Sequence, residues 1–110
     1  MGASKTDLFS DEQNLIATIA KALGHPARVA IIEYLLRAEG CICMDIVDEV
    51  GLSQPTISQH LRELKDAGLI KGSIRRNAIC YCIEKEALLK LQGYLARITN
   101  RTTKGGSQKC

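Results

Sequence analysis

The sequence predicts a mostly α-helical protein with one small β-hairpin, an α+β fold of the winged helix-turn-helix class. Two observations lead to this prediction. Apolar residues recur at helical spacing in five segments, and a segment rich in β-forming residues, LIKGSIRRNAICYCIE, stands between the fourth and the fifth. A turn near Arg76-Asn77 makes that segment a hairpin. Two short helices followed directly by a hairpin are the order expected of a winged helix-turn-helix.

The first two predicted helices have clear start and stop signals. Ser10 or Asp11 can cap the first helix, and Gly24 ends it. Pro26 opens the second helix, because proline suits a first turn, and Gly40 stops it. The predicted buried stripe of the second helix is Val29, Ile31, Ile32, Leu35 and Leu36.

The remaining helices surround the predicted hairpin. A short third helix covers about 43–50, and Gly51 provides the permissive residue that the following turn needs. Ser53 caps the fourth helix, which has Pro55 in its first turn and Ile57, Leu61 and Leu64 facing inward. The last helix covers about 85–99, and its apolar stripe is Leu88, Leu91, Leu95 and Ile98.

Length and charge indicate one domain with a basic half. We expect the 110 residues to form a single domain over 10–99, with a flexible segment at 1–9 and a flexible basic tail at 100–110 that ends in Cys110. The first 50 residues carry a net charge of −4 and the rest +7, which favours an anionic polymer such as DNA as partner. We expect a cytoplasmic location, because no signal peptide or membrane span is recognisable.

The outer face of the fourth helix has the side chains expected of a helix that enters the major groove. Stepping about 100° per residue from Ile57 turns Pro55, Gln59, Arg62 and Asp66 outward. Glutamine can bond adenine edges, and basic hairpin residues can neutralise phosphates. His60 lies about 60° from the inward face, so packing and base contact are equally open for it. The predicted contacts to double-stranded DNA are Ser53, Gln54, Pro55, Thr56, Ser58, Gln59, His60, Arg62, Lys71, Arg75 and Arg76.

Three motifs in this order resemble the ArsR/SmtB family of metal- and metalloid-sensing bacterial repressors. They are ALGHPARVAIIEYLL, GLSQPTISQHLRELKDAGLI and the hairpin with its following helix, and they cover about residues 15–98. The resemblance implies a homodimer that binds a palindromic operator and releases it when an inducer binds. It also implies that the first and last helices form the dimer interface, here through Leu15, Ile19, Leu88, Leu91, Leu95 and Ile98.

The arsenic- and antimony-sensing branch of that family carries Cys-x-Cys at the start of the third helix, where this chain has GCICMD. The resemblance therefore implies that Cys41 and Cys43 bind the inducer, and soft thiolates suit trivalent arsenic or antimony. The usual third cysteine of the branch is replaced by Ile46. Three explanations stay open: Cys110 is the third ligand, Cys80 or Cys82 replaces it, or the inducer is an organoarsenical that needs two thiols. Our prediction takes Cys110.

The other chemistry of the sequence is less specific. Cys80 and Cys82 alternate on one face of a strand, and we interpret them as small residues packed beneath the hairpin, with a second thiol site or a redox pair as alternatives. A thiol redox switch and a cadmium- or lead-responsive repressor are the alternative functions. The last helix lacks the paired Asp and His of zinc sensors, and His25 is expected to cap or pack. No grouping of catalytic residues is recognisable, so we expect neither an enzyme nor an organic cofactor.

Overall fold

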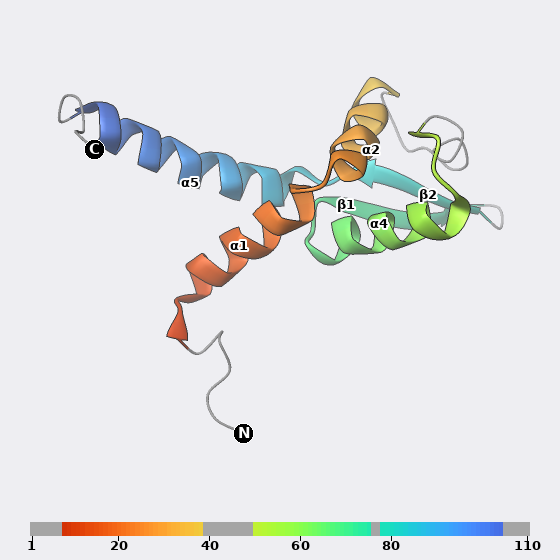
Figure 1. The fold of residues 1–110 in the computed structure, drawn as a ribbon, viewed down its shortest axis with the longest axis horizontal. Coiled ribbons are helices and arrows are strands. Elements are labelled where there is room, and N and C mark those ends of the chain that lie inside the picture. Colours follow the sequence, from red (N-terminus) through yellow and green to blue (C-terminus); the bar gives the residue numbers. More distant parts are fainter. Residues whose placement is uncertain (1–7, 39–49, 76–77, 105–110) are drawn as a thin grey trace.

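The computed structural model describes residues 8–38, 50–75 and 78–104. Their elements follow the order α1 (Asp11–Leu23), α2 (Pro26–Arg37), α4 (Gln54–Asp66), β1 (Ile70–Arg75), β2 (Ala78–Ile83) and α5 (Lys85–Lys104). Figure 1 shows α4 and the hairpin at one end of the molecule, while α1 and α5 extend away from them. This is the winged helix-turn-helix predicted from the sequence.

The local signals act as expected at most helix ends. Ser10 caps α1 through a reciprocal pair of bonds, in which its hydroxyl accepts from the Gln13 N–H and the Gln13 side chain accepts from the Ser10 N–H. Gly51 and Gly68 have φ angles of +83° and +80°, a left-handed conformation that only glycine adopts without strain. These two glycines turn the chain immediately before and after α4.

One apolar core joins α1, α2, α4 and the hairpin. Its fully buried centre is formed by Ile19, Ile31, Ile57, Leu64, Leu69 and Ile70. Each of the three helices contributes to that list, and α4 also contacts β1 while α2 contacts β2. The predicted recognition helix, α4, is therefore packed against the core through its inner face, and its outer face is exposed.

The hairpin is antiparallel, and its register runs without interruption from Ile70 opposite Ile83 to Arg75 opposite Ala78. Directly opposite residues share a face of the sheet. Ile70, Tyr81 and Ile83 therefore lie on the face that packs against the core. Cys80 and Cys82 lie on the other face, opposite Ser73 and Lys71 respectively.

Some of the predicted boundaries and packing differ from the structure. The last helix continues to Lys104, into the segment that we predicted to be a flexible tail. Val29 and Leu36 are exposed, so only Ile31 and Leu35 of the predicted stripe of α2 are fully buried. The predicted third helix lies outside the described residues except for Val50, which is helical.

Within the residues that the structure describes, no single helix is long and apolar enough to span a membrane. The pair α1 and α2 meets that test only in combination, with a bend of 85° between the two helices.

Candidate functional site

The exposed face of α4 presents short polar side chains next to the Gly51 turn. Ser53, Gln54, Pro55, Thr56, Ser58, Gln59 and Arg62 are all exposed. The Ser53 hydroxyl donates to Thr56 Oγ1 at 3.0 Å and the Gln54 amide donates to Ser58 Oγ at 3.1 Å. Ser53 occupies the capping position without a side-chain bond to the helix backbone. These groups therefore bond one another on the surface and can exchange those bonds for bonds to a ligand.

The hairpin adds basic groups next to this helix. Lys71 on β1 is exposed and makes a long ion pair of 3.9 Å with Glu84, which costs little to exchange for a phosphate. Arg75 ends β1. Arg76, the third predicted basic contact of the hairpin, lies outside the described residues.

His60 does not belong to the exposed face, which corrects its predicted role as a DNA contact. Its side chain is only 7% exposed, and the Arg28 Nε–H donates to its Nδ1 at 3.0 Å. The same guanidinium donates to the Ala22 carbonyl at 3.3 Å, so Arg28 links the end of α1 to α4. The His25 ring lies 4.5 Å from the His60 ring. Arg28 could not be predicted as a partner of His60, because nothing in the local sequence signals a contact with α4.

The surroundings of His60 favour its neutral form. Burial, followed by the charges of His25 and Arg28, lowers the pKa of His60 below its ordinary value of 6.5. A neutral His60 can accept the Arg28 hydrogen bond at Nδ1, whereas a protonated one cannot. His25 itself caps α2, since its Nδ1 accepts from the Ala27 N–H at 3.0 Å. This capping role agrees with the sequence prediction for His25.

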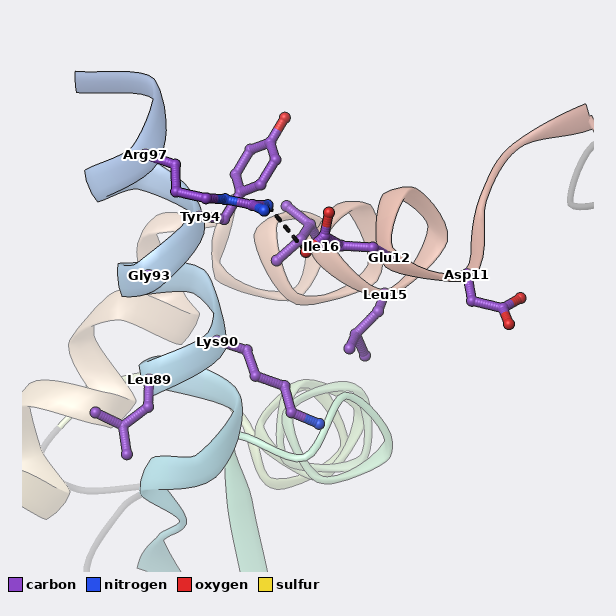
Figure 2. Close-up of a pocket in the computed structure, with 9 residues that line it drawn as sticks. All are labelled: Asp11, Glu12, Leu15, Ile16, Leu89, Lys90, Gly93, Tyr94 and Arg97. Carbon is purple, nitrogen blue, oxygen red and sulfur yellow. Dashed lines mark ion pairs between the residues drawn. The ribbon is translucent and has the colours of Figure 1, made fainter. Parts of the chain in front are cut away.

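A second feature is an apolar groove between α1 and α5, at the predicted dimer interface. Figure 2 shows the groove, which encloses about 530 Å³ and is lined by Leu15, Ile16, Leu89, Gly93 and Tyr94 with charged residues at its margin. Glu12 and Arg97 form an ion pair of 2.9 Å across it. Further along α5, Leu95 is 50% exposed and Ile98 is 45% exposed.

The predicted interface residues fall into three groups by their burial in the structure. Ile19 is fully buried in the core of its own chain, so its assignment to the dimer interface was wrong. Leu88 and Leu91 are half-buried against that core. Leu15, Leu95 and Ile98 are exposed and can contact a partner.

The predicted inducer ligands Cys41, Cys43 and Cys110 lie outside the described residues. Among the residues that the structure does describe, no group of three or more His, Cys, Asp or Glu side chains could hold a metal ion. Cys80 is fully buried, as expected for a packed cysteine, but it lies on the hairpin face opposite the core. Both Cys80 and Cys82 are disulfide-bonded in the structure.

A glycine turn followed by a helix with an exposed polar face and a hairpin wing defines a winged helix-turn-helix regulator. A family model described as "Bacterial regulatory protein, arsR family" matches residues 25–71. Nodulation protein NolR of Rhizobium meliloti is 32% identical over 101 residues, which are 90% of this chain and 80% of NolR. The arsenical resistance operon repressor of Staphylococcus xylosus is 34% identical over 73 residues, which are 66% of this chain and 69% of that repressor.

The fold also resembles that of a solved DNA-binding domain. The solved winged helix-turn-helix DNA-binding domain of Mb0332 from Mycobacterium bovis covers 99% of this chain and 98% of its own, with a TM-score of 0.65 and 22% identity. The chain belongs to the ArsR family of bacterial transcriptional regulators. This is a family of regulators and not of enzymes, in agreement with the sequence prediction.

Proposed function

We propose that the protein is a dimeric repressor that binds operator DNA and releases it when trivalent arsenic or antimony binds to cysteine thiolates. The observation that carries the DNA-binding part is the exposed polar face of α4, from Ser53 to Arg62, beside the basic hairpin. The inducer part is supported by the Cys41-x-Cys43 spacing and by the S. xylosus relative, which is named an arsenical resistance operon repressor.

In this proposal α4 enters the major groove and the hairpin follows the phosphates. Gln59 and Arg62 point outward on successive turns of α4, where they reach base edges and the adjacent backbone. The first turn of α4 carries no acidic side chain, so the positive end of its dipole is available to a phosphate. Lys71 and Arg75 then add affinity that falls as salt rises, because each releases condensed counterions from the DNA.

A second copy of the chain is the proposed occupant of the α1–α5 groove. The radius of gyration is 17.1 Å, whereas a compact domain of this length has about 13 Å. Figure 1 shows α5 projecting from the rest of the molecule, which contributes to this difference. Three of its large apolar side chains are exposed, Leu89, Leu95 and Ile98. The related Mb0332 domain is described as homodimeric. A two-fold dimer would cover both apolar faces and place two copies of α4 one DNA turn apart.

The decisive experiment is fluorescence anisotropy of a labelled DNA duplex that the wild-type protein has selected from a random pool. Arsenite, a phenylarsenical, cadmium, lead, zinc and peroxide are titrated separately against the complex under otherwise reducing conditions. Release by arsenite that is lost in Cys41→Ser/Cys43→Ser, with DNA affinity unchanged before inducer is added, supports the proposal. Preserved release by arsenite in that double variant refutes the proposed ligands.

A thiol redox switch is the second candidate function. The observation that favours it is that Cys80 and Cys82 are both disulfide-bonded. In this case peroxide alone releases the DNA, and a reducing agent restores binding without removal of any metal. Release by cadmium or lead at lower concentration than arsenite would instead identify a sensor of those divalent ions.

A further inference from the structure

Two isoleucines near the free end of the hairpin form an apolar patch that neither the core nor the proposed phosphate contacts explain. Ile74 and Ile79 are directly opposite one another in the register. Ile74 is 79% exposed, the largest exposed fraction of any large apolar side chain among the described residues, and Ile79 is 51% exposed. Single apolar side chains are ordinary on a surface. A cross-strand pair is instead a contiguous patch that a partner can cover.

The patch lies on the face of the hairpin that packs against the core. Alternation puts Ile74 and Ile79 on the same face as the core residue Ile70, which is four residues, or about 13 Å, from Ile74 along β1. Gly72 keeps this face continuous, because a Cβ at that position would lie 3.3 Å from Tyr81 Cε1 and 3.4 Å from Ile79 Cγ2. The apolar face therefore extends past the core and ends in two exposed side chains.

The free end of the hairpin lies beside the start of α4. The Gly68 turn reverses the chain after α4, β1 contacts α4, and Figure 1 shows β1 running back toward the end at which α4 begins. A helix is about 10–12 Å across and the major groove is about 12 Å wide, so a recognition helix fills the groove that it enters. The end of the hairpin then has to cross the phosphate strand beside α4, where it meets the next minor groove.

We propose that Ile74 and Ile79 enter the minor groove beside the site of α4 and make binding there selective for A·T pairs. This inference rests on the proposed function and deepens its DNA-binding part. Residues 70–83 carry three basic side chains and no acidic one, so the charge of the hairpin is complementary to DNA. The patch is also continuous with the exposed face of α4, through the contact between β1 and that helix.

The selectivity follows from the edges that base pairs present in the minor groove. Both kinds of pair offer acceptors there, but a G·C pair adds the guanine N2 amino group as a donor. An isoleucine packed against that amino group excludes water from it and offers no acceptor, which weakens binding about tenfold for each buried donor. Adenine has only a C–H group at the same position, which isoleucine covers without leaving a donor unpaired.

Base substitutions in the DNA test this inference with the unaltered protein. In the selected duplex, each position that flanks the site of α4 is made A·T, G·C or inosine·cytosine in turn, and fluorescence anisotropy gives the affinity. Inosine lacks the N2 amino group but keeps the major-groove edge of guanine. We expect G·C at one or two flanking positions of each half-site to weaken binding about tenfold, and inosine·cytosine to restore it.

Threonine variants link the effect to the two isoleucines. Ile74→Thr and Ile79→Thr keep a β-branched side chain, and the new hydroxyl can accept a hydrogen bond from the guanine amino group. Each variant should bind the A·T duplex less tightly, and its preference for A·T over G·C should shrink to about threefold or less. Lys71→Gln is the matched control: it should weaken binding to all three duplexes equally and lower the slope of affinity against salt by about one. Thermal melting checks that all the variants fold.

The outcomes separate this inference from the proposed function. If the wild type binds DNA but does not distinguish G·C from inosine·cytosine, or if the threonine variants keep the full preference for A·T, the inference is wrong and the proposed function stands. If the threonine variants instead change the sedimentation of the DNA-free protein, Ile74 and Ile79 contact a second copy of the chain and the inference is again wrong. If the wild type selects no duplex from the pool, the proposed DNA binding fails and the inference fails with it.

Discussion

The hydrogen bond between Arg28 and His60 should stabilise the contact between α2 and α4 by a measurable amount. The His60 ring is 7% exposed, and the Arg28 Nε–H is the donor to its Nδ1, at 3.0 Å. Arg28→Met leaves that buried acceptor without its donor, which costs about 1–3 kcal/mol, and the bond to Ala22 is also lost. The double variant Arg28→Met/His60→Phe leaves no buried acceptor without a donor. Its loss of unfolding free energy should therefore be smaller than the sum of the losses in the two single variants.

The measurement is a double-mutant cycle from urea unfolding, followed by circular dichroism at pH 7.5. We expect a coupling energy of about 1–2 kcal/mol between Arg28 and His60. All four proteins are compared at one protein concentration, because the stability of a dimer depends on concentration. Arg28→Lys is the matched control, since it keeps the charge but loses the planar donor group. A coupling energy below about 0.3 kcal/mol, the usual error of additivity, would show that the bond contributes nothing.

Three further perturbations have defined outcomes. The pKa of His60 in the folded protein is lowered from 6.5, so neutral His60 contributes stability above pH 6.5, and this contribution is lost as the pH falls through the folded pKa. His60→Phe should flatten this part of a plot of unfolding free energy against pH. A curve identical to that of the wild type would contradict the argument from burial. Gly51→Ala should lower the free energy of unfolding in urea by about 1 kcal/mol, because a residue with a Cβ is strained in the left-handed conformation although the added Cβ meets nothing within 4 Å. An unchanged free energy of unfolding would mean that the turn readjusts freely. Leu95→Ala should weaken dimerisation by about 2 kcal/mol, or about thirtyfold, if the dimer covers both half-exposed copies of Leu95. Analytical ultracentrifugation measures the dissociation constant, and Leu36→Ala on α2 is the control. Equal effects of the two substitutions would place the interface elsewhere.

The elements could be predicted from the sequence because their signals are local. Pro26, Gly51 and Gly68 act through their own backbone angles, so their positions fix the ends of α2 and α4 without knowledge of the rest of the chain. The end of α5 has no such signal. It continues past 99 to Lys104, and Thr99 and Thr102 form side-chain bonds to carbonyls one turn back.

The errors concern residues whose surroundings are set by distant segments. The burial and hydrogen bonding of His60 depend on Arg28, which lies 32 residues earlier in the chain. The helical angle of His60 alone left packing and base contact equally open. Ile19 and Leu15 share one stripe of α1, yet the core of the same chain covers Ile19 and leaves Leu15 exposed. Alternation correctly placed Cys80 and Cys82 on one face of a strand, but only the register shows that this face is opposite the core.

The register also bears on how far a redox signal at the hairpin cysteines would have to travel. Cys82 is directly opposite Lys71 on the same face of the hairpin, and Cys80 is directly opposite Ser73. Side chains in such positions have Cβ atoms about 4.5–5.5 Å apart. If Cys82 is oxidised and reduced in the redox switch considered above, the changed sulfur is therefore the immediate neighbour of a lysine that we assign to the phosphates. Because β1 also packs against α4, a shift of this strand would disturb the hairpin contact and the recognition helix together. Release of DNA would then require no pathway through the core that connects α1 and α2.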